Sequence, residues 1–188
     1  MQKKRFDFQK KNNDSQKKVE SYYYIARALI SFGQYEESAV YLEKAFQEPA
    51  LKNDDLLKAV LLNLQATFYS RISLEESSYQ NNLKALELIK SNKDLESRLF
   101  VANLYTKIAD YFAEMNDLKK AQEWSTKSIQ LIEKIPDKEY LSVKRIYKNK
   151  PFIYFYKSRF YLLEKNQKKL FHLLKKDMSK LYVKIINI

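Results

Sequence analysis

The chain has 188 residues, and its content of 45% apolar residues excludes an intrinsically disordered protein. One Gly and three Pro are too few for the tight turns of a β-sandwich or barrel, so the composition favours long helices. Cysteine is absent, which excludes disulfides and thiolate metal sites, and no apolar stretch approaches the roughly 18 residues of a membrane span. These features are typical of a cytoplasmic protein.

The net charge of +12 is concentrated at the two ends of the chain. Residues 1–18 have a charge of +5 and residues 138–188 a charge of +11, whereas the residues between them sum to −4. The basic ends indicate either an electrostatic patch for nucleic acid or an acidic partner, or the solvated surface of a Lys-rich protein. We expect residues 1–18 to form a poorly ordered basic segment and residues 19–188 to form one helical domain.

Apolar residues recur at spacings of three and four along most of the chain, which predicts consecutive helices. The predicted helices form pairs over residues 19–48, 54–90, 95–135 and 151–183.

Breaks between these helices coincide with residues that stop or start a helix. Gly33 tolerates a positive φ and separates the two helices of the first pair, and Pro49 ends the second helix. Asn53 is the expected N-cap of the third helix. Pro136 ends the sixth helix, and Pro151 opens the next because proline fits a first helical turn.

The first pair resembles a tetratricopeptide repeat. Within YYYIARALISFGQYEESAVYLEKAF, the packing positions of the family's first helix correspond to Tyr22, Ile25 with Ala26, and Leu29. The Gly-x-Tyr turn of the family matches residues 33–35. The second helix of the family has small, large and small residues, which here are Ser38, Leu42 and Ala45.

Further copies of the pattern follow along the chain. Ala66 and Ala109 repeat the position of Ala26, at spacings of 40 and 43 residues instead of the family's usual 34 or so. A weaker copy surrounds Tyr154. Small residues at these positions let two helices approach to about 8–10 Å. The resemblance implies an all-α fold, a right-handed solenoid of antiparallel helix pairs that forms a tetratricopeptide-like superhelix.

The sequence shows little that could support catalysis. His172 is the only histidine, and no cluster of His, Cys and carboxylate residues suggests a metal site. A single glycine excludes a Gly-rich phosphate loop. We therefore expect no catalytic residue, no metal, no cofactor and no enzymatic activity.

The resemblance also implies a concave groove lined by the first helix of each pair, in which a protein or peptide partner binds. The expected groove residues are Tyr23, Arg27, Asn63, Thr67, Arg71, Asn103, Thr106, Asp110, Phe155 and Arg159.

Three functional hypotheses remain open from the sequence. The first is a non-catalytic scaffold for protein–protein or peptide interaction that uses this groove. The second is the sensor or regulatory arm of a bacterial transcriptional regulator or signalling kinase, because the apolar C-terminal end resembles a junction to an output domain. The third is nucleic-acid binding through the basic region 138–188.

Overall fold

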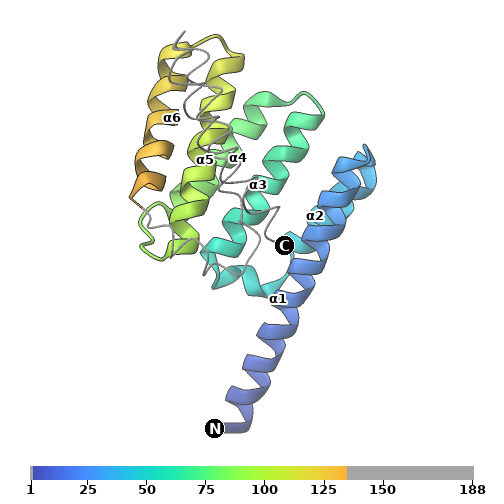
Figure 1. The fold of residues 1–188 in the computed structure, drawn as a ribbon. Helices are drawn as coiled ribbons and strands as arrows, with labels where there is room; N and C mark the ends of the chain where they lie inside the picture. Colours follow the sequence, from blue (N-terminus) through green and yellow to red (C-terminus); the bar gives the residue numbers. More distant parts are fainter. Residues whose placement is uncertain (1, 135–188) are drawn as a thin grey trace, which may run out of the picture. The chain divides into compact units, whose positions relative to one another are not determined.

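The computed structural model describes residues 2–134, with side chains from residue 13 onward. All regular elements in this part of the chain are helices, as the sequence predicted: α1 (Gln2–Ser31), α2 (Tyr35–Phe46), the 3₁₀ helix η1 (Pro49–Lys52), α3 (Asp55–Arg71), α4 (Glu75–Ile89), α5 (Leu95–Glu114) and α6 (Leu118–Glu133) (Figure 1). The chain forms two compact units, residues 1–91 and 92–188. The first contains α1–α4, and the described helices of the second are α5 and α6.

The helices pack as three hairpins. Hairpin 1 is formed by α1 and α2, hairpin 2 by α3 and α4, and hairpin 3 by α5 and α6 (Figure 1). Inside the first unit, α1 and α2 also contact α3. The bounds of α2–α6 agree with the prediction to within two residues, because strong helical periodicity is interrupted there by clear turn residues. The predicted fourth pair, 151–183, lies outside the described residues.

The start of α1 differs from the prediction. The helix begins at Gln2, so the expected boundary at residue 19 falls inside a single helix. Ser15 shows how this extension is held: its side chain is buried, its hydroxyl donates to Glu48 Oε2 at 2.8 Å, and it accepts from the Ala50 N–H at 3.0 Å. These bonds join α1 to the start of η1, a helix that the sequence analysis did not predict.

The first helices of hairpins 2 and 3, and the second helix of hairpin 3, are capped by aspartates. Each carboxylate accepts a backbone N–H three residues later and so satisfies a donor that the helix leaves unpaired. The pairs are Asp54 with Leu57 at 2.9 Å, Asp94 with Ser97 at 2.9 Å, and Asp117 with Lys120 at 3.1 Å. The expectation that Asn53 caps α3 is therefore wrong by one residue, since Asp54 does so.

Two of these caps have a lowered pKa. Burial raises the pKa of Asp94, but hydrogen bonds from the backbone N–H and hydroxyl of Ser97 outweigh it and hold the pKa below its usual value. The pKa of the half-buried Asp117 is lowered by hydrogen bonds from the backbone and side chain of Lys120. Both carboxylates are therefore stabilised in the ionised form in which they cap a helix.

The turn inside each hairpin has the same backbone geometry. Gly33, Ser73 and Asn116 have φ values of +76°, +61° and +58°. In each case the N–H of the following residue bonds the carbonyl five residues back, at 2.9, 2.9 and 2.8 Å, which is the Schellman ending of a helix. Ser73 thus adopts the conformation that glycine adopts in hairpin 1, although the sequence there shows no turn residue of that kind.

Nine small residues occupy equivalent places in the three hairpins. Each hairpin has one on its first helix and two on its second, at offsets of 12 and 19 residues from the first. All nine are at most 9% exposed: Ala26, Ser38 and Ala45; Ala66, Ser78 and Ala85; Ala109, Ala121 and Ser128. Small side chains at these points allow the two helices of a hairpin to pack closely. The predicted repeat is therefore present in the packing of all three hairpins.

Candidate protein-binding surface

Three of the predicted groove residues are buried or half-buried. Tyr23, Asn63 and Thr106 occupy one equivalent position on α1, α3 and α5, and the side chains of Tyr23 and Thr106 are 8% and 2% exposed. Asn63 is half-buried, and its Nδ2 donates to Asn82 Oδ1 on α4 at 2.8 Å. Thr106 Oγ1 donates to the Ala102 carbonyl at 3.0 Å. Asn63 and Thr106 thus each contact the second helix of their own hairpin.

A second equivalent position is less buried. Arg27 on α1 is exposed, and it corresponds to the half-buried Thr67 on α3 and Asp110 on α5. Thr67 Oγ1 donates to the Asn63 carbonyl at 3.0 Å. Arg71 lies one helical turn after Thr67 and is exposed.

Arg27 and Arg71 are the predicted groove residues of the first unit that are exposed. Neither forms a salt bridge within the part of the chain that the structure describes. Asn103 is half-buried on α5, in the second unit. Phe155 and Arg159 lie outside the described residues. The structure therefore brings two exposed cations, Arg27 and Arg71, to the first helices of one unit.

The helical spacing placed Ile25 on the packing face of α1, but it is 40% exposed. The buried stripe of α1 is instead made of Val19, Tyr23, Ala26 and Ile30. These residues follow one another at four, three and four positions, the spacing of a helix packed against one neighbour. The helix is therefore rotated by about one residue from the expected orientation.

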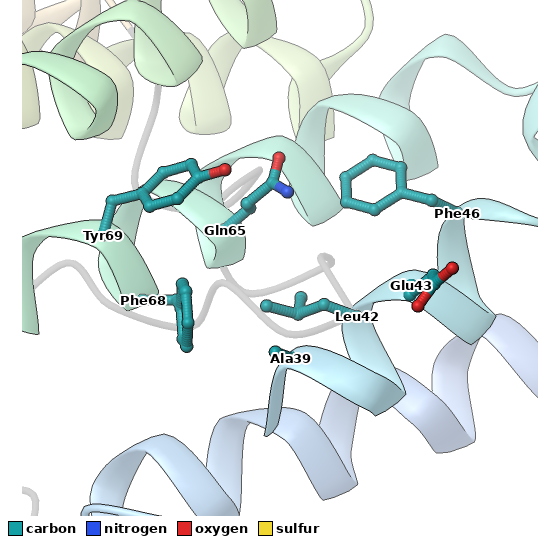
Figure 2. Close-up of a pocket in the computed structure, with 7 residues that line it drawn as sticks. All are labelled: Ala39, Leu42, Glu43, Phe46, Gln65, Phe68 and Tyr69. Carbon is teal, nitrogen blue, oxygen red and sulfur yellow. The ribbon is translucent and has the colours of Figure 1, made fainter. Parts of the chain in front are cut away.

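A hollow of about 420 Å³ lies between α2 and α3 inside the first unit, at a place that the sequence did not indicate (Figure 2). Its lining is mainly apolar, with one amide and one carboxylate. The lining residues are Ala39, Leu42, Glu43 and Phe46 from α2, and Gln65, Phe68 and Tyr69 from α3. Tyr35 on α2 packs edge-on against Phe68, with ring centroids 6.4 Å apart. The hollow thus has the aromatic walls of a site for a small apolar group.

The amide of Gln65 is held in place from outside the hollow. Asn81 on α4 is 6% exposed, and its Nδ2 donates to Gln65 Oε1 at 2.8 Å. The carbonyl of the Gln65 amide is thereby occupied, and Figure 2 shows its nitrogen turned toward the side of Phe46. No described residue accepts from this nitrogen, so a donor remains for a ligand. The positions equivalent to Gln65 on α1 and α5 hold Ile25 and Ile108. A polar residue where the other two hairpins have isoleucine was the sequence signal that could have indicated this site.

Negative charge lies beside the hollow. Glu43 lines it, and Glu36 and Glu37 are exposed on the same helix. None of the three forms a salt bridge within the described residues, and Lys44 lies over the Tyr41 ring at 5.0 Å from its centroid. The surface of α2 therefore attracts cationic groups.

Residues 2–134 contain neither a cluster of metal-binding side chains nor a helix that could span a membrane. No group of three or more His, Asp or Glu residues is placed to bind a metal ion in this part of the chain. None of the described helices is long and apolar enough to cross a membrane.

Comparison with protein families matches the tetratricopeptide repeat at two places, residues 19–48 and 102–135. These segments cover hairpin 1 from Val19 onward, and most of hairpin 3. Hairpin 2 is not matched, although it has the same turn and the same small residues. Neither the curated proteins nor the solved structures give a match.

Proposed function

We propose that this chain, which is a tetratricopeptide-like helical repeat protein, is a non-catalytic scaffold that binds segments of other proteins on the exposed faces of its helices. The observation that supports this most directly is the pair of exposed, unbridged cations Arg27 and Arg71 on the first helices of the first unit. Arginine is enriched among residues that dominate binding energy because it makes several hydrogen bonds and stacks on apolar groups.

The rigid part of each hairpin is well suited to present such side chains. Its interior is closed by small residues and by hydrogen bonds such as Ser38 Oγ to the Ala26 carbonyl at 3.2 Å and Ser128 Oγ to the Ala102 carbonyl at 2.7 Å. A binding residue on a packed helix loses little conformational freedom on association. Arg27 and Arg71 project from helices that are fixed in this way.

The proposal is tested by affinity purification of the tagged full chain from its native cells, followed by titration of the recovered partner. Arg27→Ala and Arg71→Ala should each weaken binding at least about fivefold, with an unchanged melting temperature. Lys52→Ala is the matched control, because it removes one exposed positive charge from the same unit outside the first-helix face. Unchanged binding in both arginine variants would contradict the proposal.

Nucleic-acid binding remains an alternative prediction for the basic region 138–188, which lies outside the described residues. The charge of +11 in that region favours it. Binding of this kind would weaken steeply with salt, so the absence of a gel shift at about 50 mM salt would exclude it.

A further inference from the structure

We propose that the hollow between α2 and α3 binds a large apolar side chain of a partner peptide, flanked by Lys or Arg. The proposal rests on the proposed role in holding protein segments, but it concerns a different surface. None of the predicted groove residues lines the hollow. It is lined by a second helix and the first helix of the next hairpin, and not by first helices alone.

Room for such a side chain arises from a small residue. Ala39 lines the hollow and is exposed, whereas the equivalent position in hairpin 2 holds Tyr79. The facing wall is formed by Phe68 and Tyr69 of α3, and Leu42 and Phe46 contribute from α2 (Figure 2). The volume of about 420 Å³ accommodates a phenylalanine or leucine side chain, and burial of such a group is the main source of affinity at peptide anchor sites.

The polar end of the hollow selects for a hydrogen-bond acceptor. Asn81 occupies the carbonyl of Gln65, which leaves the Gln65 Nε2 group as a donor without a described acceptor. A backbone carbonyl next to the anchor residue is the acceptor that any peptide supplies. Because Asn81 is almost fully buried, the Gln65 amide is fixed before the peptide binds, which reduces the entropic cost of binding.

Charge indicates which peptides are preferred. Glu43 lies at the edge of the hollow and accepts only a bond from Gln47 Nε2 at 3.3 Å among the described residues. Glu36 and Glu37 are exposed on the same helix, and none of these three carboxylates has a described basic partner. A lysine or arginine beside the apolar anchor complements this surface, whereas an acidic neighbour would be repelled.

The test uses the ¹⁵N-labelled full chain and an acetylated, amidated peptide in which Phe is flanked by Lys and then Ala on both sides. Amide resonances are followed by NMR during titration to a few mM, on the order of the affinity expected for one anchor residue. We expect saturable shifts at the Gln65 side-chain amide and at the backbone of Ala39 and Phe46. Replacing Phe by Ala in the peptide should raise Kd at least about tenfold. Replacing both Lys by Glu should raise it about threefold or more.

Two pairs of protein variants distinguish specific binding in the hollow from non-specific binding to the surface. Ala39→Tyr fills the hollow and should raise Kd at least about tenfold, whereas Val40→Tyr adds the same side chain at the next, 48% exposed position and should leave Kd unchanged. Glu43→Lys should raise Kd about threefold, and Glu37→Lys, which reverses a charge that does not line the hollow, should have a smaller effect. Circular dichroism melts check that each variant is folded.

Equal binding by wild type and a folded Ala39→Tyr variant would overturn the proposal, as would equal binding of the Phe and Ala peptides. If Ala39→Tyr does not fold, the peptide pair and the Glu43→Lys comparison still decide. The Arg27→Ala and Arg71→Ala proteins should bind this peptide as wild type does. If those two proteins lose binding to the native partner while Ala39→Tyr has no effect on peptide binding, the proposed peptide site in the hollow is rejected. The scaffold function is retained in that case.

Discussion

Hairpins 1 and 3 differ from hairpin 2 in the side chains that lie beside the small residues common to all three hairpins. In hairpin 1 the rings of Tyr22 and Tyr41 are 6.1 Å apart, and Lys44 lies over Tyr41. Hairpin 3 repeats this arrangement, with the rings of Tyr105 and Trp124 5.6 Å apart and Lys127 Nζ 3.8 Å from the Trp124 ring centroid. The two ring pairs have the same interplanar angle of 46°.

Hairpin 2 replaces this aromatic stack with amides. Leu62 and Asn81 stand at the two ring positions, and Asn81 bonds to Gln65 while Asn82 bonds to Asn63. The turn of the hairpin nevertheless has the same geometry. The three hairpins thus share the small residues and the turn, whereas the side chains beside them differ.

Larger side chains at the small-residue positions should have the largest effect on stability. These substitutions test whether the three hairpins are packed equivalently. We expect Ala26→Leu, Ala66→Leu and Ala109→Leu each to lower the free energy of unfolding by about 3 kcal/mol, because these residues are at most 1% exposed where helices cross. Denaturant titration gives the change. Ala39→Leu is the exposed control and should stay within about 0.5 kcal/mol. If Ala66→Leu alone were tolerated, the helices of hairpin 2 would be packed differently from those of hairpins 1 and 3.

Exchange of the amides in hairpin 2 for the residues of hairpin 1 tests the second part of the comparison. Asn82→Leu removes the acceptor of the half-buried Asn63 amide and should cost about 2 kcal/mol. The double variant Asn63→Tyr/Asn82→Leu introduces the residues that hairpin 1 has at the equivalent positions, Tyr23 and Leu42, and should recover more than half of that loss. A double-mutant cycle in denaturant measures the coupling. Strictly additive losses would indicate that the two hairpins are not interchangeable at this position.

The turns should respond according to the residue that holds the positive φ. Gly33→Ala should cost about 1 kcal/mol, because a Cβ is disfavoured at φ of +76° even though no atom lies within 4 Å of it. Ser73→Gly should raise the free energy of unfolding by about 0.5 kcal/mol for the same reason. Thermal melts of both variants provide the measurement. A destabilising Ser73→Gly would mean that the Ser73 side chain makes a contribution that outweighs its backbone strain.

The smallest expected effect is a pH dependence at the start of α5. Because the pKa of Asp94 is lowered in the folded chain, its cap contributes fully above the unfolded pKa near 4 and is lost as the pH falls through the lower folded value. Asp94→Asn keeps a capping oxygen but removes the charge. Its melting temperature should therefore fall less than that of wild type between about pH 6 and pH 3. Parallel curves for the two proteins would contradict this assignment.

Much of the fold could be predicted from the sequence because it depends on local features. Periodic apolar residues and a few turn residues set the bounds of α2–α6 to within two residues. The recurrence of Ala26, Ala66 and Ala109 predicted the paired helices, since close helix packing requires small residues at fixed intervals. The groove residues remain a prediction, and of the eight that are described, Tyr23 and Thr106 are buried and Asn63 is half-buried, which the helical spacing alone did not reveal.

The sequence by itself determined the helices, their pairing and their repeat, because periodicity, turn conformation and side-chain size act within some forty residues of chain. Only the tertiary structure decided that α1 extends before residue 19 and which face of α1 is buried, because that face packs against other elements: the Ser15 hydroxyl bonds Glu48 and the N–H of Ala50. The hollow likewise depends on side chains of two hairpins, and on the hydrogen bond by which Asn81 orients Gln65. Contacts of this kind join side chains of different helices whose relative positions are fixed only by packing, so the periodic pattern of the sequence could not specify them.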